Sequence, residues 1–265
     1  MKNLISTLLL MVTITGCQAG DTNSENVNHS DSIKLHIDMD SYIDDFSQSQ
    51  PTRTIQFNIR IFADDGVSKS QIIVNPNDEF EITIDGFTYD LNQQFDQTSS
   101  LTGFSRYSAK LNNVDKDIKK VSVRLKIHTG VYQATYTIPK SLKVNNYSKR
   151  SMMFNPMYDA IDLSWIAESH PSKVRVVHEL YAKSSSSKCS TLDNEYLVQY
   201  HENSVFINPG FTQASCAQAD NIEKVKTEVT LSTDNESLHW DYRSFDKSSF
   251  SYQETYTWKN EWTAP

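Results

Sequence analysis

Apolar and polar residues alternate along most of this chain with a period of two residues, and that period predicts β-strands. Apolar side chains occupy nearly every second position over residues 33–39, 55–61, 80–84, 121–127, 132–136, 161–165, 174–180, 205–207, 225–231, 238–242 and 250–258. A further strand is predicted at residues 197–200. No long apolar stripe of period 3.6 is present, so amphipathic helices are not expected. The pattern therefore predicts an all-β protein.

Turn-forming residues separate the predicted strands. Asp85-Gly86 predicts a tight hairpin between residues 79–84 and 87–91. Short strands with turns every 8–12 residues are typical of β-sandwiches. We expect a boundary after Pro139, which gives two immunoglobulin-like antiparallel β-sandwich domains at residues 33–143 and 144–265. One larger, continuous sandwich is the alternative.

The first residues have the layout of a secretion signal. Lys2 is followed by an apolar run from Leu4 to Ile14, which is too short to span a bilayer as a helix. The run ends in Ile14-Thr15-Gly16-Cys17, which resembles the lipobox of bacterial lipoproteins. The resemblance implies a signal peptide at residues 1–16, acylation of the Cys17 thiol, and attachment to a membrane through the acyl chains.

The residues after the cysteine bear on location. Gln18 stands where enterobacterial lipoproteins retained in the inner membrane carry Asp, so the resemblance implies the outer membrane, on its periplasmic face or at the cell surface. The polar composition of residues 18–32 favours a flexible tether over residues 17–32. Such a coil would span roughly 20 Å.

The net charge of the chain limits the classes of molecule that it is expected to bind. The chain has 25 Lys and Arg against 33 Asp and Glu, a net charge of −8. Removal of Lys2 with the signal peptide brings the mature chain to −9. This balance argues against binding to nucleic acid and against direct docking on anionic lipid headgroups.

Three cysteines are present, and one of them is the acylation candidate. The remaining two, Cys189 and Cys216, predict one structural disulfide in an oxidising compartment. A metal site would need further ligands close by, and His201 alone does not supply them. We expect no metal site in the chain.

Short strand motifs add a second resemblance. They are the hairpin at Asp85-Gly86, the strands Tyr107–Leu111 and Val123–Ile127, a closing strand that ends at Pro139, and Asp162-Leu163-Ser164-Trp165. Together they resemble uncharacterised tandem β-sandwich lipoproteins of proteobacteria, over most of residues 70–240. The resemblance implies architecture and location, and it brings no known activity or catalytic residue.

Catalytic motifs are missing from the sequence. Seven glycines are few for phosphate-binding loops or nucleophile elbows, and G-x-S-x-G, G-x-G-x-x-G and H-E-x-x-H do not occur. The acidic group Asp38, Asp40, Asp44 and Asp45 lacks the glycine and the closing glutamate of a calcium loop, so we interpret it as an acidic loop. The sequence therefore predicts no enzyme and no cofactor.

Aromatic residues crowd the C-terminus. Exposed rings can stack on sugars, which makes Trp258 and Trp262 candidate ligand contacts; the alternative is that such rings fill the core. We expect a non-catalytic, lipid-anchored cell-envelope protein that acts through protein–protein contacts or structural support. A carbohydrate-binding envelope lipoprotein is the first alternative. The second is an enzyme without local sequence motifs, such as a glycosidase that uses two carboxylates distant in sequence.

Overall fold

The computed structural model of the chain describes residues 21–44, 52–90, 96–99, 105–112, 114, 117–146, 154–166, 171–183, 188–199, 201–209, 222–234 and 236–264. Its regular structure is almost entirely β-strand, with one short 3₁₀ helix, η1 (Ser24–Asn26). The prediction of an all-β, sandwich-like protein is confirmed.

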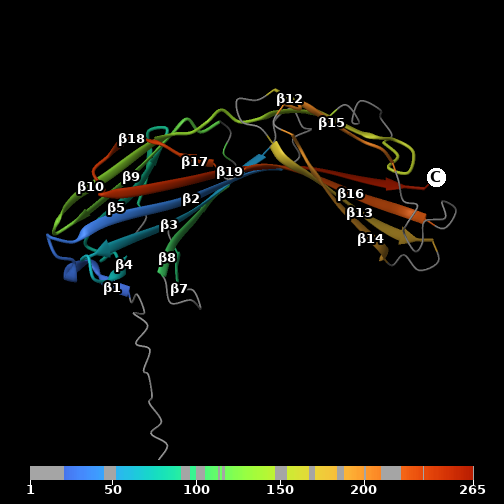
Figure 1. Cartoon of the computed structure of the whole chain (residues 1–265). Helices are drawn as coiled ribbons and strands as arrows, with labels where there is room; N and C mark the ends of the chain where they lie inside the picture. The colour runs from blue at the N-terminus through green and yellow to red at the C-terminus, as the bar shows by residue number, and fades with distance from the viewer. Residues whose placement is uncertain are drawn as a thin grey trace, which may run out of the picture.

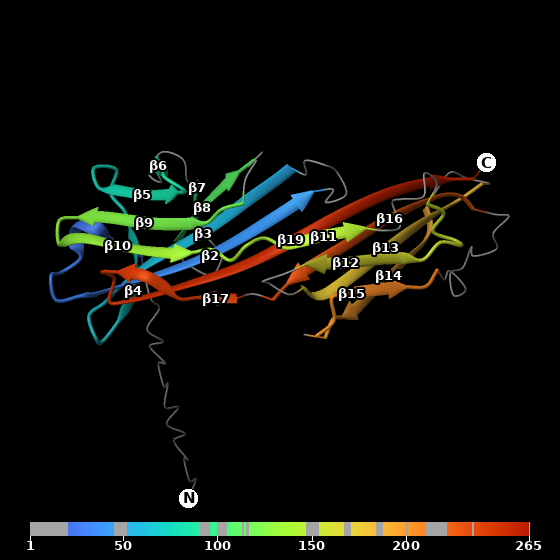
Figure 2. The ribbon, with the colours of Figure 1, turned by 90° about the horizontal axis from the view of Figure 1, so that it is seen from above.

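Sheet A is the largest of three sheets and runs the length of the molecule (Figures 1 and 2). Its strands follow the order β1 (Asp21–Asn23), β4 (Lys69–Ile73), β3 (Thr52–Asp64), β2 (Ser32–Asp44), β19 (Lys247–Thr263), β16 (Ile222–Thr233), β13 (Pro171–Ala182) and β14 (Lys188–Leu197). Three further strands join it, β7 (Asp96–Ser99), β8 (Ser105–Leu111) and β17 (Glu236–Leu238).

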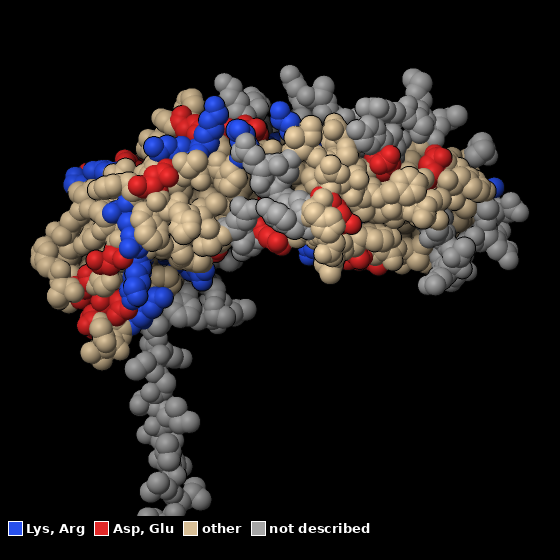
Figure 3. Space-filling model, turned by 45° about the horizontal axis from the view of Figure 1, so that its top comes forward, with Lys and Arg blue, Asp and Glu red and all other residues tan. Residues whose placement is uncertain are grey.

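Two smaller sheets cover the two halves of sheet A, and the body as a whole is arched (Figures 1 and 3). Sheet B lies over the first half with the order β18 (Trp240–Arg243), β10 (Gly130–Thr137), β9 (Lys120–Ile127), β5 (Glu79–Ile84) and β6 (Phe87–Asp90). Sheet C lies over the second half with the order β11 (Lys143–Asn146), β12 (Ile161–Ile166) and β15 (Ser204–Ile207). We call these halves the first and the second sandwich.

The 17-residue strand β19 connects the sandwiches. Its first part pairs in parallel with β2, from Lys247 opposite Lys34 to Tyr256 opposite Ile43. Its last part pairs antiparallel with β16. One strand therefore belongs to both halves, and Figure 2 shows it crossing the length of the body.

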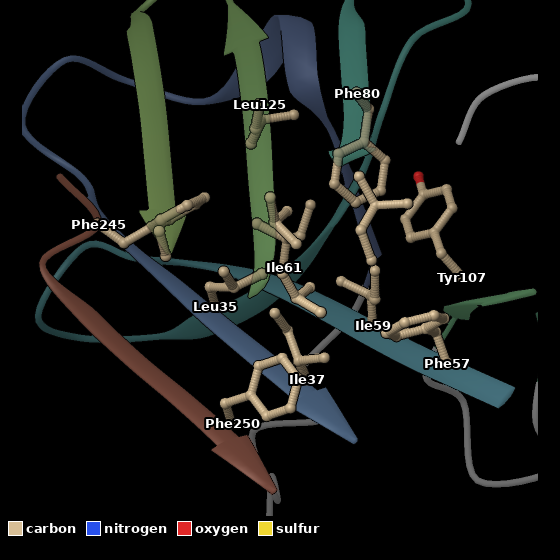
Figure 4. Close-up of a cluster of buried hydrophobic side chains, with 14 of the residues drawn as sticks. Leu35, Ile37, Phe57, Ile59, Ile61, Phe80, Tyr107, Leu125, Phe245 and Phe250 are labelled. Carbon is tan, nitrogen blue, oxygen red and sulfur yellow. The ribbon is translucent and has the colours of Figure 1, made fainter. Parts of the chain in front are cut away.

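Each sandwich has its own core. The first is filled from sheets A and B, and Figure 4 shows Phe57 and Ile59 of β3, Phe80 of β5 and Leu125 of β9 converging there. The second is filled from sheets A and C, where Phe154 packs edge-on against Trp258 with 5.3 Å between ring centroids. Alternation along the strands explains both cores, because every second side chain points inward.

The predicted boundary at residues 143/144 does not divide the cores. Phe245, Phe250 and Tyr252 follow that boundary by a hundred residues, yet they belong to the first core. Figure 4 shows Phe250 beside Ile37 of β2. The immunoglobulin-like detail is not confirmed, because sheet A passes through both halves and includes a parallel strand pair.

The predicted tether at residues 17–32 needs correction. Residues 21–23 form β1 against β4, and Ser24 and Val27 are almost completely buried. The Ser24 hydroxyl donates to the Asp78 carboxylate at 2.5 Å, and Val27 packs in the first core. Polar composition suggested a free coil, but these specific partners hold residues 21–32 on the sandwich.

The hairpin at Asp85-Gly86 is confirmed, because Ile84 pairs directly with Phe87. Both turn residues have positive φ, 47° and 92°, as this tight turn requires. Asp85 is the one non-glycine residue with positive φ in the described part of the chain. Its carboxylate accepts the backbone N–H groups of Lys119 and Lys120, which fixes the turn to the segment that enters β9.

Candidate functional site

The cysteines predicted to carry modification or a disulfide are only partly visible. Cys17 and Cys216 lie outside the described residues. Cys189 is half-buried at the start of β14, beside the small apolar cluster of Leu180, Ile222 and Val225. The acylation and the Cys189–Cys216 disulfide both remain predictions.

The tryptophans predicted as ligand contacts are not free surface rings. Trp258 is 3% exposed and packs in the second core, so it cannot stack on a sugar. Trp262 is half-buried against the cluster that contains Leu180. For Trp258 the prediction is wrong, because the strand's alternation turns that ring toward sheet C.

Two exposed rings lie on β18, which among the described strands pairs only with β10 and so forms an edge of sheet B. Trp240 is 42% and Tyr242 is 56% exposed. The Arg243 guanidinium lies 3.9 Å from the centre of the Trp240 ring and covers one of its faces. The sequence pattern predicted a strand here but could not show that it ends a sheet.

Edge strands carry much of the apolar surface. Half of the large, exposed apolar side chains among the described residues lie on β6, β14, β15 and β18, each of which ends a sheet; they are Phe87, Leu197, Phe206, Trp240 and Tyr242. Proteins usually protect open edges with charge or with short strands, since an edge exposes unpaired N–H and C=O groups. These edges are therefore the candidate functional site.

The broad outer face of the second sandwich is different. Cross-strand ion pairs cover it, including Arg175 with Asp193, Lys173 with Glu195 at 3.3 Å, and Lys259 with Glu228 at 3.9 Å. Exposed pairs of this kind add little stability, but they keep the surface hydrated. Among the described residues this face is therefore a charged, solvated surface.

A buried carboxylate lies where the two sandwiches meet. Glu254 of β19 is 1% exposed and accepts hydrogen bonds from the hydroxyls of Tyr252 at 2.6 Å and Tyr256 at 2.7 Å. The Ser141 hydroxyl and the Leu142 amide, both in the segment that crosses between the sandwiches, donate at 2.7 and 3.2 Å. We call this group the junction cluster.

The junction cluster also includes a cation, the Arg53 guanidinium of β3. Arg53 lies 3.9 Å from the Glu254 carboxylate, and it donates to Ser141 at 2.6 Å and to Asp117 at 2.9 Å. Burial, together with the Glu254 carboxylate, raises the pKa of Tyr252 and of Tyr256 well above the usual phenol value. Both phenols therefore remain donors, and the cluster serves as a structural clamp.

His178 provides a titratable group in the second sandwich. It is half-buried on β13, with its Nδ1 atom 2.9 Å from the Thr227 hydroxyl. Burial lowers the pKa of His178 from 6.5 to about 4. As the pH falls, His178 of the unfolded chain therefore becomes protonated near pH 6.5, whereas His178 of the folded chain becomes protonated only near pH 4.

We expect the free energy of unfolding to fall as the pH drops below 6.5, because the extra proton on unfolded His178 favours the unfolded state. Between pH 7 and pH 5 the loss from this residue is on the order of 1–2 kcal/mol. Urea unfolding of His178→Gln at both pH values should show a weaker pH dependence than the parent protein. The same substitution at exposed His239 is the control; an unchanged dependence in His178→Gln would contradict the assignment.

Three of the four acidic residues that the sequence suggested as a loop are part of a strand, and the fourth, Asp45, lies outside the described residues. Asp38, Asp40 and Asp44 lie on β2, and Asp38 accepts hydrogen bonds from His36 and Ser251. Within the described residues, no three His, Cys, Asp or Glu side chains are grouped as they would be around a metal ion. The same part of the chain contains no helix of the length and apolarity needed to cross a membrane.

Comparison with solved structures gives remote matches. No family model and no curated protein matches the chain. The Mu homology domain of Fcho1 from Danio rerio, solved with a bound Eps15 peptide, matches with 9% identity and a TM-score of 0.30, covering 86% of this chain and 96% of that one. The yeast delta-COP-I mu-homology domain in complex with a Dsl1 WxWxV peptide has 8% identity and a TM-score of 0.25, covering 86% and 95%.

A third match is the dimeric latent PorU of Porphyromonas gingivalis, at 12% identity and a TM-score of 0.22, covering 86% of this chain and 20% of that one. At these TM-scores the matches carry no argument about function.

Proposed function

We propose that this chain is a non-catalytic lipoprotein of the bacterial outer membrane, anchored through acyl chains on Cys17 and acting through contact with a partner protein. The observation that supports contact is the exposed apolar side chains on open edge strands. A partner strand added to such an edge would satisfy the free backbone groups, while pockets for Phe206 or Tyr242 would provide specificity.

The anchoring part of the proposal predicts a large change in location. In a bacterial host that acylates lipoproteins, the parent protein should fractionate with membranes and incorporate labelled palmitate. Cys17→Ser should lose the label and leave the membrane fraction, because stable anchoring needs the acyl chains. A Cys17→Ser protein that stayed with the membrane to the same extent would refute acylation as the anchor.

The contact part is tested by crosslinking the acylated protein in intact cells, capturing it, and identifying what is bound by mass spectrometry. We expect one reproducible partner that is lost when an edge ring is replaced, in Phe206→Lys or Tyr242→Lys. Val67→Lys is the matched control, since Val67 is 91% exposed but lies outside the edge strands. Loss of the partner in the control as well, or in none of the variants, would contradict recognition at an edge.

Carbohydrate binding is the alternative function, which the aromatic residues near the C-terminus suggested. The burial of Trp258 removes one of its two candidate rings, and Arg243 covers one face of the exposed Trp240. A sugar would have to use the open face of Trp240 or the Tyr242 ring. We therefore place partner binding first.

A further inference from the structure

A cavity of about 530 Å³ lies on the face of sheet A that points away from sheet B in the first sandwich. Its lining comes from β2, β3, β4, β19 and the end of β18 and consists of Lys34, Leu35, His36, Arg60, Phe62, Lys69, Arg243, Lys247, Ser248 and Ser249. The volume is in the range of small-ligand sites. We call this cavity the basic pocket.

Strand register assembles the basic pocket from distant parts of the sequence. Lys247 of β19 is opposite Lys34 of β2, and His36 is opposite both Ser249 and Arg60. His36 Nδ1 lies 2.5 Å from the Ser249 hydroxyl, although these residues are 213 positions apart. The parallel pairing of β19 with β2 therefore creates the pocket.

Two carboxylates beside the pocket already form ion pairs with lysine or arginine of its lining. Lys34 forms an ion pair with Asp64, and Arg60 lies 3.3 Å from Asp38. The hydrogen bond from His36 is the largest cause that lowers the pKa of Asp38, to about 2, with Ser251 and Arg60 contributing. Asp38 is therefore ionised and bound to its own strand neighbours.

Three cations of the pocket form no ion pair among the described residues, although the pKa of Asp64 is lowered first by its hydrogen bond from Lys34 and also by the nearby charge of Lys69. Lys69, Arg243 and Lys247 form no ion pair with any of the described acidic residues; Lys69 lies 3.9 Å from the centre of the Phe62 ring, and Arg243 stacks on Trp240. Asp246 neighbours Lys247 in sequence, but its carboxylate accepts the Ile33 amide at 2.8 Å. An excess of positive charge thus gathers in a chain whose net charge is −8.

Such a pocket suits a compact oxyanion. Lysine and arginine donate charge-assisted hydrogen bonds to phosphate oxygens. Ser249, whose hydroxyl lies beside His36, lines the same cavity. The whole-chain charge argued against headgroup docking, but only the local field acts on a group inside the pocket. The remaining question is the source of the phosphate.

The short separation between Cys17 and the basic pocket favours a membrane lipid as the source of the phosphate. β1 begins at Asp21, which pairs with Gln71, two residues from Lys69 at the pocket. Cys17 is four residues before Asp21, so the chain between them spans at most about 14 Å. This step rests on the proposed acylation, which would hold the basic pocket close to the headgroup layer.

We propose that the basic pocket binds the phosphate group of an anionic lipid headgroup. The test uses the full mature chain carrying Cys17→Ser, so that no acyl chain contributes to binding in any sample. Sedimentation compares vesicles of phosphatidylcholine alone with vesicles that also contain phosphatidylglycerol. Calorimetry with inorganic phosphate and with glycerol 3-phosphate forms the soluble arm.

Lys247→Gln is expected to weaken binding to the anionic vesicles about fivefold, the effect of one lysine near an anionic surface. Lys259→Gln is the matched control, because Lys259 is exposed on the same strand and the same face of sheet A, in the second sandwich. We expect less than a twofold effect there. Thermal unfolding checks that both variants fold.

Equal weakening in both variants would overturn the proposal in favour of diffuse attraction, and no weakening in either would overturn it outright. Binding of glycerol 3-phosphate without binding to vesicles would overturn the headgroup and identify a soluble phosphorylated ligand instead. Because every sample lacks the acyl chain, none of these outcomes depends on whether Cys17 is acylated. That question is decided separately by the palmitate label.

Discussion

Replacing Glu254 with alanine is expected to lower the free energy of unfolding by about 3–5 kcal/mol. The substitution leaves the hydroxyls of Tyr252 and Tyr256 and the amide of Leu142 buried without their acceptor. It also removes the buried carboxylate beside Arg53, so that the ion pair left to Arg53 is the one with the largely exposed Asp117. Each of these losses is costly because water cannot replace the carboxylate inside the protein. Urea unfolding measures the change.

The control for this experiment lies on the same strand. Glu261 is exposed on β19 and forms surface ion pairs with Lys224 and Lys226, so Glu261→Ala should cost less than about 1 kcal/mol. Glu254→Gln keeps the size of the side chain but loses the charge, and it should fall between the two. Equal effects of Glu254→Ala and Glu261→Ala would show that the junction cluster does not clamp the sandwiches.

The second large effect is expected from Phe250→Ala, at about 3–5 kcal/mol. The Phe250 side chain is fully buried in the first core, 4.6 Å from Tyr136 between ring centroids. Its removal leaves a cavity in a core whose side chains come mostly from the first 140 residues of the chain. Chemical denaturation should therefore show that a residue near the C-terminus stabilises the N-terminal half.

Phe87→Ala provides the comparison, since Phe87 is 73% exposed at the tight hairpin. Its loss should change stability by less than about 0.5 kcal/mol. If Phe250→Ala were equally mild, β19 would not be an integral part of the first core, and the two halves would be separable as the sequence boundary suggested.

Local pattern was sufficient to identify most strands. Alternation from Ile33 to Met39 and from Val121 to Ile127 gave the strands and the inward side of each, because burial on a sheet has a strict period of two. The Asp85-Gly86 turn was predictable from its residues alone, since few pairs accept two successive positive φ values. These features depend on neighbours within a few residues.

Pairing between distant strands was not predictable in the same way. The alternation of Phe250 and Tyr252 is the same whichever sheet receives them, so nothing local showed that β19 joins β2. The basic pocket could not be predicted for the same reason. In the sequence Lys34 and Lys247 resemble ordinary exposed lysines, and only the pairing of β2 with β19 places them side by side. The junction cluster was missed for a related reason, since Glu254 interrupts an apolar pattern and resembles a surface position.

The tryptophan prediction failed on a finer point. Trp258 and Trp262 lie on the same face of β19, but the residues that pack against that face differ along the strand. Trp258 lies beneath Phe154, whereas Trp262 lies beside the small cluster at the sandwich end. Aromatic content near a chain end therefore does not distinguish a core ring from a surface ring.

The position of β19 also sets the order in which the molecule can form. Apart from its C-terminal aromatic residues, the first core is complete in sequence at Ile138, yet it cannot close until Phe245 and Phe250 have been synthesised. At about 5–20 residues per second, the ribosome needs roughly 5–22 s to make that intervening stretch. During this interval the open side of the first sandwich exposes apolar strands to the solvent. The nascent chain should therefore depend on a holding chaperone until its last strand arrives.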